Sequence, residues 1–264
     1  MALWTTAVTD GVAVATYRHP PMNYFCAEGT RELSDLIEVW RDPAIRAVVL
    51  TGGIEGKFIT HYSVEELLAL ARDREMLRAL GANVTAGYHV LLQRLRDLPK
   101  AVVVAMNGDT MGGGFELSLA CDIRIAQRGD HRFGLPETRL GILPGGSGTQ
   151  RLSRLIGAGR AIEFILRGRV VTPEVALQLG LVHEVVDDAA NRARALGTEL
   201  AALPPVGIAQ AKRAIYDGSD ATLATGLEIE GAAFLESMLS DDAVRAMQAY
   251  VDLPLEERRR RLEQ

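Results

Sequence analysis

The chain has 264 residues and a mass of 28.6 kDa, which suits one large domain or one domain with a helical appendage. Its net charge of −5 argues against nucleic acid or an anionic membrane surface as the main partner. Two distant cysteines, Cys26 and Cys121, and five scattered histidines predict neither a disulfide framework nor a metal site. The N-terminus opens directly into a strand-like pattern, and no apolar run reaches the roughly 18 residues of a membrane span. We therefore expect a cytoplasmic protein.

The first half of the chain alternates between strand and helix patterns. Residues 5–18 alternate apolar and polar around Asp10-Gly11, which predicts a β-hairpin. Helical spacing is present at 28–40, 64–71 and 83–97, and short apolar runs typical of buried strands are present at 46–50 and 100–106. The recurrence of strand, strand and helix predicts an α/β fold with parallel strands joined by crossover helices.

The second half becomes almost wholly helical. Helices are predicted at 148–156, 158–167, 173–179, 188–202, 205–217 and 221–250, with one late strand at 181–186. The shift near residue 190 predicts a catalytic region, 1–190, and a C-terminal helical region, 191–264. The last long helix carries apolar side chains that predict an interface between subunits, namely Leu223, Leu227, Phe234 and Met238.

The most informative stretch lies between residues 104 and 142. A β-branched apolar run stops at Asn107-Gly108, and three glycines at 112–114 then open a helical pattern with Glu116 in its first turn. Such a glycine run exposes N–H groups at a helix N-terminus, where the helix itself cannot satisfy them. A second carboxylate, Glu137, follows Pro136. Donors for an oxyanion beside two carboxylates favour chemistry next to a carbonyl group.

The motifs of this stretch form one ordered series. The chain reads Asn107-Gly108 through Glu116-Leu117, then Cys121–Ala126, then Phe133–Glu137 and Pro144–Leu152. The series resembles the pattern N-G-x-x-x-G-G-G-x-E-L, C-D-x-x-x-A, F-G-x-P-E-x-x-x-G-x-x-P-G-x-G-G-T-Q-R-L of the enoyl-CoA hydratase/isomerase (crotonase) superfamily. The resemblance implies a spiral of ββα turns followed by a C-terminal helical trimerisation region. It also implies that coenzyme A is part of an acyl-CoA substrate and that no cofactor is tightly bound.

The resemblance also implies roles for individual residues. In the hydratases of this family the two matching glutamates, here Glu116 and Glu137, hold the attacking water as catalytic base and proton donor. The backbone N–H of Gly113 matches one oxyanion donor, and Gly112 and Gly145 match the lining of the substrate pocket. Retention of both glutamates favours hydration of an enoyl-CoA. The alternatives are double-bond isomerisation, decarboxylation or hydrolysis of an acyl-CoA, or a non-catalytic oligomeric binding module.

The second oxyanion donor is where the sequence departs from the family. Most members read F-x-A-G-A-D, whereas this chain reads Phe58-Ile59-Thr60-His61-Tyr62-Ser63. Tyr62 occupies the donor position, and we expect its backbone N–H to serve there. The larger Thr60, His61 and Tyr62 are expected to reshape the substrate pocket, with His61 either an added acid/base or a partly exposed loop residue. Lys57 is expected either near the nucleotide end of coenzyme A or as a solvated surface charge. The chain is expected to form a homotrimer or a dimer of trimers.

Overall fold

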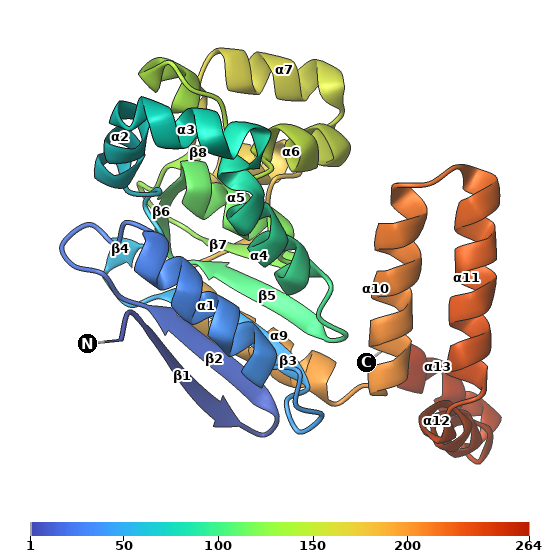
Figure 1. The fold of residues 1–264 in the computed structure, drawn as a ribbon. Coiled ribbons are helices and arrows are strands. Elements are labelled where there is room, and N and C mark those ends of the chain that lie inside the picture. Colours follow the sequence, from blue (N-terminus) through green and yellow to red (C-terminus); the bar gives the residue numbers. More distant parts are fainter. Residues whose placement is uncertain (1, 264) are drawn as a thin grey trace.

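A six-stranded sheet is the framework of the computed structural model, which describes residues 2–263 (Figure 1). Its order is β1 (Trp4–Thr9), β2 (Val12–Tyr17), β3 (Ala47–Gly52), β5 (Ala101–Met106), β7 (Ile123–Gln127) and β10 (Glu184–Val186). β1 and β2 pair antiparallel, and all later neighbours pair parallel. Asp10 and Gly11 turn the hairpin with φ of 49° and 76°, both positive as a type I′ turn requires. The predicted hairpin and parallel sheet are confirmed.

A smaller sheet lies beside the first. It has the order β4 (Gly56–Lys57), β6 (Gly108–Met111), β8 (Phe133–Gly134) and β9 (Val170–Val171). In three successive turns the chain passes from a strand of the large sheet to one of the small sheet and on to helices, which include α2 (Val64–Arg72), α5 (Gly112–Ala120) and α6 (Gly148–Ile156). This is the expected spiral of ββα turns.

Helices cover both faces of the large sheet. α1 (Ala27–Val39) and α4 (Ala86–Arg96) lie on one face, and α9 (Ala189–Ala201) lies on the other (Figure 1). Side chains alternate along a strand, so Val48 of β3 joins the core beneath α1 and α4, whereas Val49 joins the core beneath α9. All six residues of β5 are buried, as expected of a central parallel strand.

The segment between α2 and α4 differs from its prediction. The helix predicted at 83–97 begins as a 3₁₀ turn, η1 (Gly81–Thr85), and only then continues as α4. A further helix, α3 (Arg74–Leu80), precedes it and was not predicted. Asp73 caps α3 by accepting a hydrogen bond from the Met76 N–H at 2.9 Å. Neither α2 nor α3 contains a buried residue, so both form an outer layer.

The later helices divide into two groups. α7 (Ala158–Leu166) and α8 (Pro173–Gln178) pack with the spiral, whereas four others stand apart from it, namely α10 (Pro205–Ser219), α11 (Leu223–Met238), α12 (Asp241–Val251) and α13 (Leu255–Glu263) (Figure 1). The prediction of one helix over 221–250 was wrong. Ser240 interrupts it as the N-cap of α12, where its hydroxyl accepts from the Ala243 N–H at 3.1 Å.

Candidate active site

A large cavity of about 1320 Å³ lies between α2 and α4 on one side and α5 with residues 136–150 on the other. Its lining includes seven of the nine residues that the sequence placed at the site: His61, Tyr62, Gly112, Gly113, Glu116, Glu137 and Gly145. Thr60 and Lys57 are not among the lining residues. The cavity therefore brings together residues of the spiral that lie up to 84 positions apart in the sequence, from 61 to 145.

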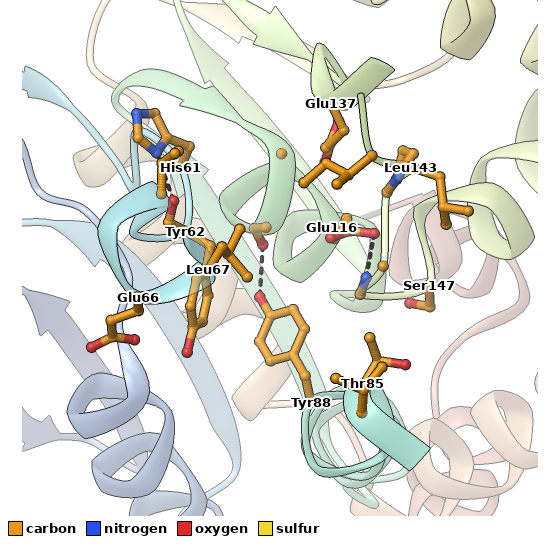
Figure 2. Close-up of a pocket in the computed structure, with 18 of the residues that line it drawn as sticks. His61, Tyr62, Glu66, Leu67, Thr85, Tyr88, Glu116, Glu137, Leu143 and Ser147 are labelled. Atoms are coloured by element: carbon orange, nitrogen blue, oxygen red, sulfur yellow. Dashed lines mark hydrogen bonds between the residues drawn. The ribbon is translucent and has the colours of Figure 1, made fainter. Parts of the chain in front are cut away.

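Glu116 projects into the cavity from α5, a helix in which every residue is buried. It lies in the second turn of the helix, which begins at Gly112, and not in the first turn as the sequence suggested. Only 3% of the residue is exposed. Its Oε1 accepts a hydrogen bond from the backbone N–H of Gly146 at 2.8 Å (Figure 2). It accepts another from the backbone N–H of Gly148 at 2.7 Å. These two bonds fix the carboxyl group in one orientation.

Glu137 approaches the same space from the start of η2 (Glu137–Leu140), directly after Pro136. The residue is 9% exposed, and its Oε2 has no hydrogen-bond partner within residues 2–263. A Cβ on Gly112 would lie 3.1 Å from Glu137 Oε1, so the glycine lets the main chain of α5 pass close to this carboxyl group. A buried carboxyl oxygen without a partner suits a group that handles a proton or a water molecule.

Burial makes both carboxyl groups reluctant to ionise. Burial, and then the charge of Glu137, raise the pKa of Glu116 to about 8, although the N–H groups of Gly148 and Gly146 act in the opposite direction. Burial raises the pKa of Glu137 to about 7. The pair can therefore hold one proton near neutral pH, which provides an acid and a base in the same cavity.

Two residues that line the same cavity, Tyr62 and Gly113, have backbone N–H groups that could bind a substrate oxygen. Phe25 and Tyr62 form a parallel bridge in which Phe25 N–H donates to the His61 carbonyl at 2.8 Å and Ser63 N–H donates to the Phe25 carbonyl at 2.7 Å. This pairing uses the groups on either side of Tyr62, and its own N–H points the other way. Gly113 lies in the first turn of α5, where N–H groups lack helical partners. Neither N–H has a partner within the described part of the chain.

The two N–H groups are also close together. A Cβ on Gly113 would lie 3.0 Å from the Tyr62 Cβ and 3.6 Å from the Tyr62 nitrogen. A carbonyl oxygen placed between the two donors would thus receive two hydrogen bonds in the cavity that the glutamates also line, which is the arrangement that an oxyanion hole requires. The changed side chains of the 60–63 loop have left this backbone geometry available.

Comparison with known proteins agrees with this geometry. The family model described as enoyl-CoA hydratase/isomerase matches residues 7–260. The chain belongs to the enoyl-CoA hydratase/isomerase family. It is 39% identical over 249 residues to YngF, a Bacillus subtilis protein named as a putative enoyl-CoA hydratase/isomerase, and 35% identical over 245 residues to the short-chain-enoyl-CoA hydratase of Clostridium acetobutylicum. The first match covers 93% of each chain, and the second covers 91% of each.

Solved structures of this family share the fold. An enoyl-CoA hydratase of Geobacillus kaustophilus superposes with a TM-score of 0.88 at 29% identity, covering 96% of this chain and 94% of that one. The enoyl-CoA hydratase of Bacillus anthracis gives a TM-score of 0.87 at 32% identity, covering 95% and 96%. The ββα spiral with its C-terminal helices is therefore the crotonase fold.

The side chains of Tyr62 and His61 point away from the glutamates in this family member (Figure 2). The Tyr62 phenol extends towards Glu66, and burial and the Glu66 charge raise its pKa above the usual range. The His61 ring stacks on Tyr24 with centroids 4.1 Å apart, and its Nδ1 lies 2.7 Å from the Tyr62 carbonyl oxygen. Both side chains therefore support the loop, and the Tyr62 main chain faces the cavity.

The other expected substrate contacts lie in different places. Thr60 is 4% exposed, and its hydroxyl donates to the Met22 carbonyl at 2.5 Å, so its side chain faces the core. Lys57 belongs to β4, outside the cavity lining. Gly145 lines the cavity, and its carbonyl lies 2.7 Å from His89 Nε2.

Sequence reasoning missed Tyr88. Its hydroxyl donates to the Gly113 carbonyl at 2.7 Å, and its ring lies 6.0 Å from the Tyr62 ring, centroid to centroid (Figure 2). The ring also packs so closely on Gly146 that a Cβ there would collide with its Cε1. Tyr88 thus contacts Gly113 and Tyr62 as well as the loop that holds Glu116. The one signal in the sequence was a hydroxyl-bearing side chain within a helix that faces the core.

Proposed function

We propose that this protein adds water across the α,β-double bond of an enoyl-CoA thioester. The observation that carries the proposal is the convergence of Glu116 and Glu137, both buried, on one cavity beside the free N–H groups of Tyr62 and Gly113. Conjugate addition of water requires a base for the water, a proton for the α-carbon and stabilisation of an enolate. The four groups supply these three functions.

The thioester carbonyl oxygen is held between the Tyr62 and Gly113 N–H groups. As water attacks the β-carbon, the electron pair of the double bond moves towards this oxygen, and the two donors stabilise the growing negative charge. One such donor contributes roughly 10²–10³ in rate. Coenzyme A takes part only as the carrier of the acyl group.

The attacking water lies between the two glutamates. With one proton shared by the pair, the ionised carboxylate removes a proton from the water and the protonated carboxyl group delivers one to the α-carbon. The raised pKa values of Glu116 and Glu137 make this singly protonated state available near neutral pH. The similarity to the short-chain-enoyl-CoA hydratase supports hydration as the reaction and a short acyl chain as the first substrate to test.

The test is incubation of the purified protein with crotonyl-CoA while the absorbance of the conjugated enoyl-thioester is followed. We expect the absorbance to fall and the product to gain the mass of one water molecule. A product of unchanged mass would assign isomerisation instead. An unchanged substrate, across short and longer enoyl-CoA thioesters, would refute the proposal.

A further inference from the structure

Ser147 adopts an unusual backbone conformation beside the site. It is the N-cap of α6, with φ of 83° and ψ of 4°. Residues with a side chain rarely occupy this left-handed region because their Cβ crowds the backbone. An N-cap residue is normally extended and accepts a hydrogen bond from the first turn of its helix, but Ser147 makes no such bond. Something else must hold it in place.

The Ser147 hydroxyl is held by Arg151, one turn further along α6. The Arg151 Nε donates to Ser147 Oγ at 2.9 Å, and Arg151 N–H donates to the Ser147 carbonyl at 2.8 Å. A second guanidinium nitrogen lies 3.4 Å from Gln93 Oε1. Within the described residues Arg151 forms no ion pair, and burial, with Arg96 nearby, lowers its pKa. Of the two hydrogen bonds that the Arg151 side chain makes with the described part of the chain, the one to Ser147 is the shorter.

The conformation of Ser147 determines where its neighbours point. Gly146 and Gly148, on either side of it, direct their N–H groups at the same atom, Glu116 Oε1. N–H groups that flank a left-handed residue form a concave site for an anion. Neither glycine has room for a side chain, because a Cβ would lie 2.5 Å from Glu116 Oε2 at Gly146 and 2.8 Å from Glu116 Oε1 at Gly148. Only Ser147 can link this turn to the helix through a side chain.

We propose that Ser147 and Arg151 are positioning residues that keep the Gly146 and Gly148 N–H groups on Glu116. The hydrogen bond from Arg151 holds Ser147 left-handed, and the turn then holds the carboxylate. The inference rests on the proposed function only for the statement that Glu116 takes part in catalysis. The geometry of the turn and its effect on Glu116 stand without it.

The expected signature is a change in the ionisation of Glu116. Three kinds of group face its carboxyl: Glu137 from η2, Tyr88 from α4, and the two N–H groups of the turn. Burial raises the pKa of Tyr88 far above its usual value, so it stays neutral, and Glu137 raises the pKa of Glu116. Only the two N–H groups lower it. Loss of the turn should therefore raise the pKa of Glu116 above about 8.

The test compares Arg151→Met, Ser147→Gly and the double variant. In Arg151→Met we expect the pKa of Glu116 to rise by about one unit, a tenfold change in its protonation equilibrium. In Ser147→Gly the pKa of Glu116 should stay at its wild-type value, because glycine adopts the left-handed conformation without help. The same wild-type pKa is expected in the double variant. Ser147→Ala loses the hydroxyl but keeps the steric cost, so it should behave like Arg151→Met.

The pKa is measured by infrared titration of the protonated carboxyl band, identified by its loss in Glu116→Gln. The limb of the kcat–pH profile that Glu116 controls should shift in the same direction. Arg154→Met, on the same helix, is the matched control and should shift neither the pKa of Glu116 nor this limb of the profile. An unchanged Glu116 pKa in both Arg151→Met and Ser147→Ala would overturn the inference, as would a double variant as impaired as Arg151→Met. The infrared titration needs no substrate, so it decides the inference even if crotonyl-CoA is not hydrated.

Discussion

The spiral and the last four helices of this molecule are stabilised by different kinds of contact. In the spiral, apolar side chains are buried on both faces of the large sheet, and all six residues of β5 are buried. Across α10–α13, Ala233 is the only buried residue described. α9 packs on the sheet with the spiral, so the helices that stand apart begin at α10 (Figure 1). The sequence had placed this change near residue 190.

Polar groups join the two parts. Asp122 Oδ2 accepts hydrogen bonds from Val102 N–H at 2.7 Å and from Lys212 Nζ of α10 at 2.8 Å. Its Oδ1 accepts from the Tyr216 hydroxyl at 2.8 Å. Lys212 Nζ also donates to the Lys100 carbonyl at 2.8 Å. A rigid apolar core thus supports the candidate site, while a few directional bonds attach helices whose apolar side chains remain exposed. We infer that the first part serves catalysis and the second serves assembly.

The largest effect is expected in the spiral, from Glu116→Gln and Glu137→Gln. Each should lower kcat by about 10²–10⁴, because a neutral amide cannot exchange the proton. In Glu116→Gln the amide oxygen can still accept from the Gly146 and Gly148 N–H groups, so the variant should still fold and assemble. Turnover of crotonyl-CoA and thermal unfolding measure the two properties.

The double variant shows whether the carboxyl groups act on one water. Residues that act as a unit are strongly non-additive, so Glu116→Gln/Glu137→Gln should lose little beyond the worse single variant. Multiplied losses would contradict a shared water. Glu163→Gln is a suitable control, since Glu163 pairs with Arg167 and Arg169 outside the cavity.

The same glutamates should make the stability of the spiral depend on pH. Burial raises the folded-state pKa of Glu116 from 4.5 to about 8, so folding favours its protonated form. This contribution is complete below pH 4.5 and is lost as the pH rises through about 8. Glu116→Gln removes the ionisation. The free energy of unfolding of the variant minus that of the wild type should therefore increase by on the order of 4 kcal/mol between about pH 4 and pH 9. Denaturant unfolding at both pH values measures it, and an equal difference at both would contradict the burial argument.

The joint between the two parts is tested by Lys212→Met. Removing the cation leaves the nearly buried Asp122 carboxylate with one partner fewer from α10, and the attachment of that helix should weaken by about 3 kcal/mol. Amide hydrogen exchange should accelerate in α10–α13 and stay unchanged in β5. Lys57→Met, in the small sheet, is the matched control. Equal acceleration in both parts would mean that they unfold as one unit.

The sequence predicted most features that depend on neighbouring residues and missed those that depend on contacts between distant residues. Hairpin, parallel strands and the glycine-opened helix were predicted because they depend on local pattern and turn chemistry, as at Asp10-Gly11. The break at Ser240 was missed because an interruption of two residues, 239–240, hardly disturbs an apolar repeat. Tyr88 was missed because its bond to the Gly113 carbonyl spans 25 positions. Thr60 aligned with a pocket residue, but its side chain direction depends on a contact with Met22 that no alignment displays.

Assembly is expected to depend on the helices that stand apart. Phe234, 65% exposed on α11, belongs to the apolar set that predicted an interface, and we propose that this surface forms a homotrimer or a dimer of trimers. Light scattering should give at least three times the subunit mass of 28.6 kDa. Phe234→Glu should reduce it, because a buried unpaired charge opposes association. Val39→Glu, at a 56% exposed site on α1, should not. A single-subunit mass for the wild type at micromolar concentration would refute the assembly.

The smallest effect is expected from Tyr62→Phe. The phenol points away from the glutamates, while the backbone N–H that faces the cavity is retained in the variant (Figure 2). The rate should therefore fall less than tenfold, about 1.4 kcal/mol at most. Assembly should not change, because the substitution lies wholly within the spiral.

Tyr62→Ala separates the ring from the N–H. The backbone N–H donor again remains, but the Tyr62 ring is lost. The centroid of this ring lies 6.1 Å from that of Phe25 and 6.0 Å from that of Tyr88, so the cavity should widen on that side. The ratio of kcat/KM for a bulkier enoyl-CoA over crotonyl-CoA should then rise. A loss of about 10³-fold or more in Tyr62→Phe, with the fold and the assembly intact, would make the hydroxyl a direct participant. Such a result would favour a reaction other than plain hydration, because neither proton transfer in the two-glutamate scheme requires a phenol.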